Sequence, residues 1–166
     1  MGNLHRRKAT LILPGGILLA MDALSTKILR ALARDGSLTQ AAIAEEVGLS
    51  LSACQRRIKA LEATGAIRGY RTLIDPALLD EGLTVFVAVD LARHARAQIQ
   101  AFQADVAALP MVKEVHRVAG AHDYLLRVAV KDIAAYEAFY ADRLTAVGGI
   151  ARITSFVAMS TLEDRP

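Results

Sequence analysis

The sequence is poor in several residue types, and each scarcity excludes a class of protein. Cys54 is the only cysteine, so one chain can form neither an internal disulfide nor a cysteine-based zinc cluster. The four histidines are scattered without the spacing of metal ligands, so we predict no metal site and no cofactor. Pro14-Gly15-Gly16 interrupts the apolar segment from Leu11 to Ala20, which is too short to span a bilayer. These absences fit a cytoplasmic protein without a membrane segment.

The chain has enough apolar residues to fold. Of its 166 residues, 54% are hydrophobic, which can bury one sizeable core or two small ones. The formal net charge of +3 is unevenly placed, because residues 1–20 hold three cations and no acid, whereas residues 21–166 hold 17 of each sign. Between Ser50 and Asp75, however, five cations stand against two acids. That local excess marks a place where a polyanion can bind.

Residues 1–20 have the outline of a secretory signal, with a cationic start and an apolar run. The run is broken by Pro14-Gly15-Gly16, and no convincing small-residue cleavage site follows, so we do not expect export. We interpret residues 1–20 as a disordered extension, or as upstream sequence read through because the start is Met21.

Three helices are predicted after Met21. The first closes at Asp35-Gly36, and Thr39 can cap a second that ends at Gly48. Ser50 is a good N-cap for the third and Gly65 a good C-terminal stop. In the third helix the residues predicted to share a buried face are Leu51, Cys54, Ile58 and Leu61. Cys54 is therefore interpreted as a core residue rather than a reactive thiol.

The third helix directs its cations away from that buried face. At about 100° per residue, Arg56 lies about 160° from Ile58, and Lys59 about 100°. The run IRGYRTLI, residues 67–74, is short and β-prone and is predicted to be a basic strand. Two short helices joined by a Gly-Leu-Ser turn, followed by such a strand, predict a helix-turn-helix whose third helix enters the DNA major groove.

The second half predicts the order β-α-β-β-α-β. The strands are expected over residues 83–91, 112–119, 124–131 and 151–160. The first helix ends at Pro110 and buries Ile99, Phe102, Val106 and Leu109. The second begins after Asp132 and buries Ile133, Tyr136, Tyr140, Leu144 and Val147. This order is the ferredoxin-like unit, an antiparallel sheet with both helices on one face, so the whole chain is α+β.

From Met21 to the C-terminus the chain resembles the Lrp/AsnC, or feast/famine, family of transcription regulators. The resemblance rests on AAIAEEVGLSLSACQRRIKALEATGAIRGYRTLIDP and VAGAHDYLLRVAV, in that order and at the family's separation. It implies a winged helix-turn-helix over 21–75, a linker over 76–83 and a ferredoxin-like domain over 84–166. It also implies promoter DNA as partner, dimers that usually assemble further, often to octamers, and an amino-acid effector bound between dimers.

Candidate site residues follow from the helix geometry together with this resemblance. Arg56 is expected to contact a base edge, with Ser52 and Gln55 as further base contacts. Phosphate contacts are expected from Arg57, Lys59, Arg68 and Arg71. The effector candidates are Gly120, Ala121, His122, Asp123, Thr154 and Ser155.

Departures from the family pattern affect both sites. Leu51 stands where proline commonly begins the recognition helix, and Gln55 stands where an apolar residue is common. Ala121 and His122 replace an acid and an aromatic residue in the loop, which leaves the effector's identity open. Asp123 can either accept a hydrogen bond from a ligand's ammonium group or serve as a turn residue. His94 and His116 are expected to be ordinary surface or strand residues.

Enzymes and RNA-binding modules of this topology have sequence signatures that the chain lacks. We find no convincing arrangement of nucleophile and base, paired carboxylates or phosphate-binding glycine loop, so we predict no enzyme and no catalytic residue. An RNA-binding module of the same topology would display aromatics on its middle strands, which offer Tyr124 alone. The alternative that stays open is a protein that binds DNA or oligomerises without an effector.

Overall fold

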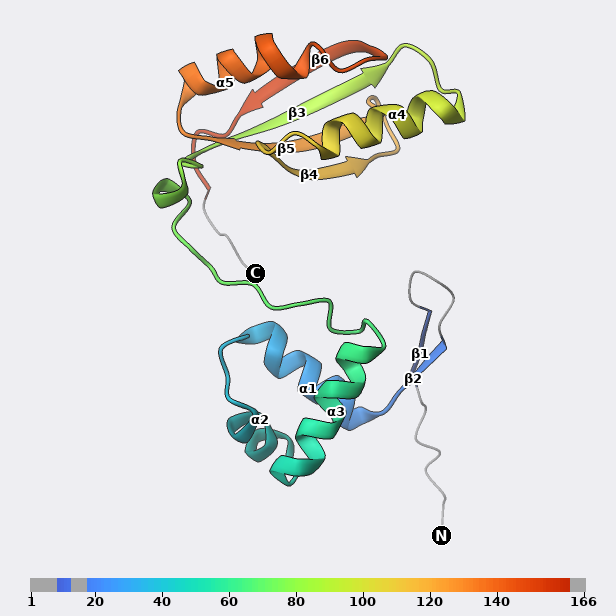
Figure 1. Cartoon of the computed structure of the whole chain (residues 1–166), viewed down its shortest axis with the longest axis vertical. Coiled ribbons are helices and arrows are strands. Elements are labelled where there is room, and N and C mark those ends of the chain that lie inside the picture. The colour runs from blue at the N-terminus through green and yellow to red at the C-terminus, as the bar shows by residue number, and fades with distance from the viewer. Residues whose placement is uncertain (1–8, 13–17, 162–166) are drawn as a thin grey trace. The chain divides into compact units, whose positions relative to one another are not determined.

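The structure is a computed structural model that describes residues 9–12 and 18–161. Its contacts divide the chain into two compact units, with the division between Leu73 and Ile74 (Figure 1). Each unit has its own hydrophobic core. No helix in the described part of the chain is long and apolar enough to cross a membrane.

The first unit contains three helices, α1 (Ala23–Arg34), α2 (Gln40–Val47) and α3 (Leu51–Ala63). Each begins at a residue whose side chain accepts a hydrogen bond from a backbone N–H of the first turn: Asp22, Thr39 and Ser50. Gly48, in the left-handed conformation at φ 73°, ends α2 and lets the chain turn sharply into α3. The predicted helices and their caps at Thr39 and Ser50 are confirmed.

The core of this unit lies between the three helices. Its buried residues are Ile28, Ala31, Ile43, Ala44, Val47, Cys54, Ile58 and Leu61. Burial also raises the pKa of the Cys54 thiol, in keeping with a packing role. Leu51, however, is 46% exposed, so its predicted place on the buried face is wrong. Side chains of a helix lean toward its N-terminus, so Leu51, the first residue of α3, directs its side chain past the start of the helix rather than onto a preceding turn.

Residues 67–74 have no regular secondary structure, so the strand predicted there is absent. A strand requires a neighbour with which to form backbone hydrogen bonds, and the described part of the same chain provides none here. The segment leads instead to a short 3₁₀ helix, Pro76–Leu79, within the predicted linker.

The leading segment contains some regular structure. Strands β1 (Ala9–Ile12) and β2 (Leu18–Met21) form an antiparallel pair, with Ala9 opposite Met21. A disordered extension therefore does not describe these two stretches. The remainder of residues 1–20 lies outside the described residues.

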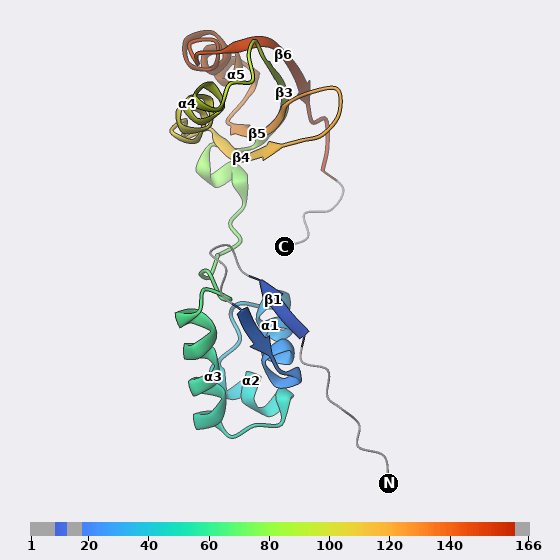
Figure 2. The same cartoon turned by 90° about the vertical axis from the view of Figure 1, so that its right-hand side faces the viewer.

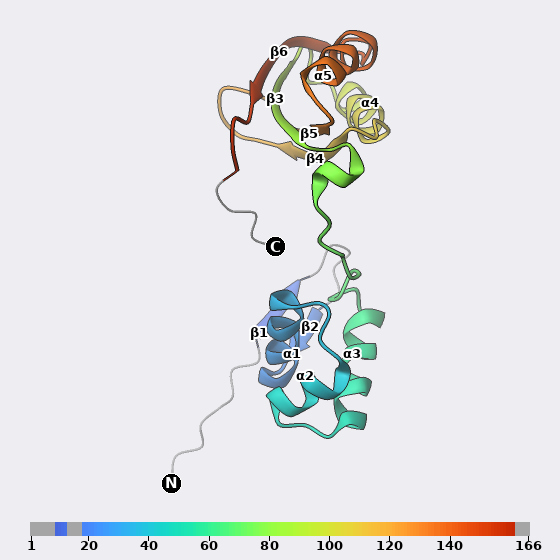
Figure 3. The same cartoon turned by 90° about the vertical axis from the view of Figure 1, so that its left-hand side faces the viewer.

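The second unit has the predicted order of elements. It comprises β3 (Leu83–Leu91), α4 (Arg96–Ala107), β4 (Val112–Arg117), β5 (Tyr124–Val130), α5 (Ile133–Phe139) and β6 (Ile150–Val157). The strands form one antiparallel sheet in the order β4-β5-β3-β6, which is the ferredoxin-like arrangement. Figure 2 and, from the opposite side, Figure 3 show α4 and α5 together on one face of this sheet.

Helix α5 departs from the predicted buried face because it continues into a π-helical turn, Tyr140–Leu144. A π turn inserts an extra residue into the helical repeat. Tyr136, Leu144 and Val147 are buried as predicted, but Phe139 is buried in place of Tyr140. Ile133, which lies before the π turn at the start of α5, is also exposed, so its predicted burial is wrong. Phe139 was missed because a spacing of five residues, from Phe139 to Leu144, does not fit an α-helical period.

Candidate DNA-binding and effector sites

The outward face of α3 carries exposed polar and cationic side chains. The exposed residues are Ser52, Gln55, Arg56 and Lys59, and Cys54 and Ile58 anchor the opposite face in the core. Neither Arg56 nor Lys59 forms an ion pair with another residue of the described segments. The helix thus presents two cations to solvent on a rigid, capped element, which suits contact with a polyanion.

Arg57 differs from its two cationic neighbours because it is engaged within the domain. Its Nη1 donates hydrogen bonds to Asp22 Oδ2 at 2.6 Å and to Ser25 Oγ at 3.2 Å. Asp22 is also the N-cap of α1, and the Ser25 backbone N–H, more than Arg57, lowers the pKa of its carboxyl. Arg57 therefore ties α3 to the start of α1, a role that helical spacing did not reveal.

The two remaining cations of the predicted DNA site follow α3. Arg68 and Arg71 are exposed on the irregular segment that leads to the linker. They are separated from the helix face by the Gly65 turn, where the backbone is left-handed at φ 73°. Arg68 and Arg71 are carried by a segment without regular secondary structure. Arg56 and Lys59, in contrast, are held in position by the helix α3.

The second candidate site is the loop between β4 and β5, which contains Gly120 to Asp123. Gly120 has φ 156°, a conformation that L side chains rarely adopt. The Asp123 carboxylate accepts a hydrogen bond from the Leu91 backbone N–H at 2.8 Å, and His94 Nε2 lies 2.9 Å from both of its oxygens. The Leu91 N–H first, and His94 second, lower the pKa of Asp123. An ionised Asp123 thus fastens the loop to the end of β3.

A second histidine–aspartate pair lies beside it. His122 Nδ1 is 2.9 Å from Asp90 Oδ1, and Arg152 Nε donates to Asp90 Oδ2 at 2.7 Å. These contacts, with His122 the larger cause, lower the pKa of Asp90. Together the two pairs form a polar cluster of carboxylates and their donors at one end of the sheet.

Three members of this cluster were not predicted: Asp90, His94 and Arg152. Their sequence separation from the loop, 32 residues between Asp90 and His122 and 29 between His94 and Asp123, left no local pattern. The strand register, which places Asp90 opposite Arg152, locates two of the three. His94, expected to be an ordinary surface residue, is a direct partner of Asp123.

The structure does not join Thr154 and Ser155 to this loop. Ser155 faces the helices, where its hydroxyl lies 2.5 Å from the Tyr136 hydroxyl. Thr154 lies opposite Ala88 and faces the other side of the sheet. No hydrogen bond among the described residues connects either of them to residues 120–123. Adjacent strand residues point to opposite faces, so one pocket in this chain cannot use both.

Comparison with known proteins identifies the class to which these two units belong. Residues 21–68 match the family model described as winged helix-turn-helix DNA-binding, and residues 84–166 match the Lrp/AsnC ligand binding domain. A leucine-responsive regulatory protein from Rhizobium meliloti is 35% identical over 144 residues, covering 87% of this chain and 92% of that protein. The Bkd operon transcriptional regulator of Pseudomonas aeruginosa is 39% identical over 142 residues, covering 86% and 93%.

Solved structures agree. An AsnC family transcriptional regulator from Agrobacterium tumefaciens superposes with a TM-score of 0.81 at 41% identity, covering 87% of this chain and 94% of that chain. A transcriptional regulator from Neisseria meningitidis, solved as a complex with L-methionine, gives a TM-score of 0.80 at 32% identity and the same coverage. The chain couples a helix-turn-helix to a ligand-binding-type domain, which defines a transcription regulator. It belongs to the Lrp/AsnC family, and the predicted resemblance and fold class are confirmed.

Proposed function

We propose that this regulator recognises its operator through Arg56, with Ser52 and Gln55 as additional base contacts. The observation that carries the proposal is the pair of exposed cations, Arg56 and Lys59, on a helix whose other face is fixed in the core. Arginine can pair with guanine in two hydrogen bonds, whereas a lysine contact to phosphate needs only charge and reach. Lys59, Arg68 and Arg71 are therefore assigned to phosphates.

The assignment of Arg57 changes in the light of its contacts. Its guanidinium already donates to Asp22 and Ser25, so a phosphate contact would compete with the bond that holds α3 to α1. We assign Arg57 to positioning the recognition helix.

The experiment is selection of bound fragments from genomic DNA, followed by titration of the selected site at several salt concentrations. Arg56→Ala should lose about 1 to 3 kcal/mol on the selected site and discriminate less at one base pair. Lys59→Ala should weaken selected and random DNA alike and reduce the slope of affinity against salt. Equal affinity of wild type and Arg56→Ala for the selected site would remove Arg56 from base recognition.

We further propose that an amino acid, bound between dimers at residues 120–123, modulates DNA binding. The Asp123 carboxylate accepts from Leu91 and His94, and a carboxylate has room for about four hydrogen bonds, so it can also accept from a ligand's ammonium group. The complex of the Neisseria meningitidis regulator with L-methionine supports this class of ligand. Gly120, Ala121 and His122 would then line the site, and Thr154 or Ser155 could join it only from another subunit.

Assembly is proposed to use the face of the sheet that no described helix covers. Phe86 on β3 lies opposite Phe156 on β6 there, and the two are 39% and 52% exposed. Exposed neighbouring aromatic side chains of this kind mark contact surfaces between proteins. A dimer formed on this face, with further assembly of dimers such as an octamer, would place residues 120–123 near other subunits. The DNA partner and the single buried thiol of Cys54 support a cytoplasmic setting.

The effector test is a thermal-shift and light-scattering screen of the twenty common amino acids on wild type and Asp123→Ala. A ligand that binds one assembly state more tightly must shift the population toward that state. We expect at least one amino acid to change the melting temperature or oligomer distribution of wild type and to have no effect on Asp123→Ala. A flat response over all twenty leaves a regulator that works without an effector.

A further inference from the structure

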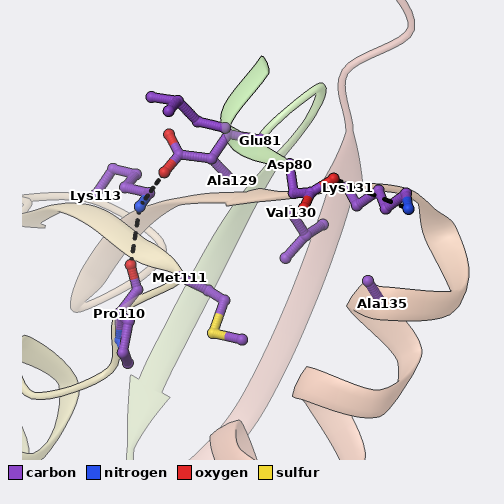
Figure 4. Close-up of a pocket in the computed structure, with 10 residues that line it drawn as sticks. Asp80, Glu81, Pro110, Met111, Lys113, Ala129, Val130, Lys131 and Ala135 are labelled. Atoms are coloured by element: carbon purple, nitrogen blue, oxygen red, sulfur yellow. Dashed lines mark hydrogen bonds and ion pairs between the residues drawn. The ribbon is translucent and has the colours of Figure 1, made fainter. Parts of the chain in front are cut away.

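A cavity of about 360 Å³ lies where the linker meets the sheet of the second unit. One wall is the end of the linker, Leu79 to Glu81. The opposite walls are the turn before β4 at Pro110-Met111, the end of β5, and Ala135 of α5 (Figure 4). Its volume falls within the range of about 300 to 1,000 Å³ that is typical of small-molecule sites.

The walls of this cavity are held in place by contacts within the unit. Lys113 Nζ lies 2.6 Å from Glu81 Oε1 and donates a hydrogen bond to the Pro110 carbonyl at 3.0 Å, so it joins the linker to the turn. These side chains are only 25% and 30% exposed, for Lys113 and Glu81 respectively. The Ala129 N–H also donates to the Met111 carbonyl at 2.9 Å. The cavity is therefore preformed, and a ligand need not order its walls.

The interior of the cavity is apolar. Figure 4 shows the side chains of Met111, Val130 and Ala135 directed toward the same space. Val130 belongs to the core of the unit and is 3% exposed, whereas Met111 is 39% exposed. A methionine at the mouth of an apolar hollow can adapt its shape to a flexible aliphatic guest.

The rim carries one exposed charge of each sign. Lys131 Nζ lies 3.9 Å from Asp80 Oδ1, and these side chains are 67% and 77% exposed, so they are only loosely paired. Asp80 is held there by an unusual backbone: it has φ 55°, and it closes the 3₁₀ helix of the linker. A ligand with only a negative charge would be repelled by Asp80 at this rim, and a ligand with only a positive charge would be repelled by Lys131. A zwitterion can pair each of its charges with one of them.

We propose that this cavity binds a free amino acid with an aliphatic or thioether side chain. The side chain occupies the space between Met111, Val130 and Ala135, the carboxylate pairs with Lys131, and the ammonium group pairs with Asp80. The site is separate from residues 120–123, because the two lie at opposite ends of β5, about 20 Å apart at about 3.3 Å per residue. A bound amino acid would connect Asp80 in the linker to the sheet and so hold the linker end against the second unit.

The test uses the full chain labelled with ¹³C at its methionine methyl groups. Met111 reports on the cavity, and Met159, which is 99% exposed, serves as the internal reference. L-leucine, L-methionine and L-valine are titrated, and leucine is compared with 4-methyl-2-oxopentanoate and 3-methylbutylamine, which each lack one charged group. We expect a saturable shift of the Met111 signal with at least one amino acid and affinities at least tenfold weaker for the two leucine analogues.

Variants separate this site from the proposed effector loop. Ala135→Leu fills the cavity and should abolish the Met111 response, whereas Ala134→Leu, at the exposed neighbouring position of the same helix, should leave it intact. Asp80→Asn, which tolerates the left-handed backbone, and Lys131→Gln should each weaken binding about tenfold or more, and both positions are too exposed to affect folding. Asp123→Ala should not change the Met111 titration.

The proposal is overturned by no saturable Met111 shift with any of the three amino acids, by equal binding of leucine and its two analogues, or by unchanged binding in Asp80→Asn and Lys131→Gln. Loss of the Met111 response in Asp123→Ala would also overturn it, by tracing the signal to residues 120–123. A failed effector screen at those residues leaves this test unaffected, because the Met111 signal is read without DNA or assembly.

Discussion

Arg57 Nη1 donates a hydrogen bond to Asp22 Oδ2 at 2.6 Å, and so joins the middle of α3 to the residue that caps α1. The neighbouring Arg56 has no such partner in the described segments and remains exposed. Two adjacent arginines on one helix therefore divide between holding the helix and facing solvent. That division can be measured.

Arg57→Ala should lower the free energy of unfolding by about 1 kcal/mol, because it removes a partly exposed ion pair together with a hydrogen bond to Ser25. Arg56→Ala should stay within about 0.5 kcal/mol of wild type, as most exposed substitutions do. Urea unfolding of the two variants provides the comparison. If Arg56→Ala is the more destabilised, the division of roles is wrong.

The Asp22 carboxyl should titrate below its ordinary pKa of about 3.9 in the folded protein. The Ser25 N–H is the largest cause, and the Ser25 hydroxyl and Arg57 add to it, against an opposing effect of burial. Because the folded pKa is depressed, the stabilisation is present above about pH 4 and is lost as pH falls through the folded pKa. Carboxyl ¹³C chemical shifts followed between pH 6 and pH 2 give the value. In Arg57→Ala the pKa should rise only part of the way, since the Ser25 bonds remain.

The helical half was predictable because its signals are local. Thr39, Gly48, Ser50 and Gly65 mark helix ends through their own backbone and side-chain chemistry, and the buried stripe of α3 repeats at the helical period. The partner of Arg57 was not predictable, because Asp22 is 35 residues away and belongs to another helix. The absent strand at 67–74 has the same origin: residue preference supplies a strand-like sequence, but pairing requires a neighbour.

Asp123→Ala should loosen the loop even without a ligand. The carboxylate accepts the Leu91 N–H and pairs with His94, so its removal leaves the end of β3 without that acceptor. We expect hydrogen exchange of the Leu91 amide to accelerate by at least tenfold, while the amides of Val87 and Leu126 in the centre of the sheet stay protected. His94→Ala, which keeps the carboxylate, is the control and should accelerate Leu91 less. An unchanged Leu91 amide in Asp123→Ala would show that this hydrogen bond does not hold the loop.

Residue type and family pattern were enough to select Asp123 but not its surroundings. Asp90 and Arg152 are brought together by the pairing of β3 with β6, and His94 follows the end of β3 and reaches Asp123 through its side chain. Sequence spacing does not encode either contact. The π-helical turn after α5 had the same effect on the core: one extra residue moved Tyr140 out and Phe139 in. Residue spacing within one segment therefore predicted neither the contacts between distant segments nor the irregular helical turn.

Phe86→Lys should convert the protein to smaller assemblies without unfolding it. Phe86 and Phe156 are directly opposed on the sheet face that no described helix covers, and both are more than a third exposed. If two copies pack through this face, a lysine at position 86 meets apolar surface and, near a two-fold axis, the same charge from the second copy.

Ile133→Lys is the matched control, because Ile133 is also an exposed apolar residue, at 52%, but lies on α5 on the other side of the sheet. Sedimentation velocity at matched concentrations should show a lower sedimentation coefficient for Phe86→Lys alone, with an unchanged far-ultraviolet circular dichroism spectrum. Identical sedimentation of wild type and Phe86→Lys would mean that the copies associate through some other surface.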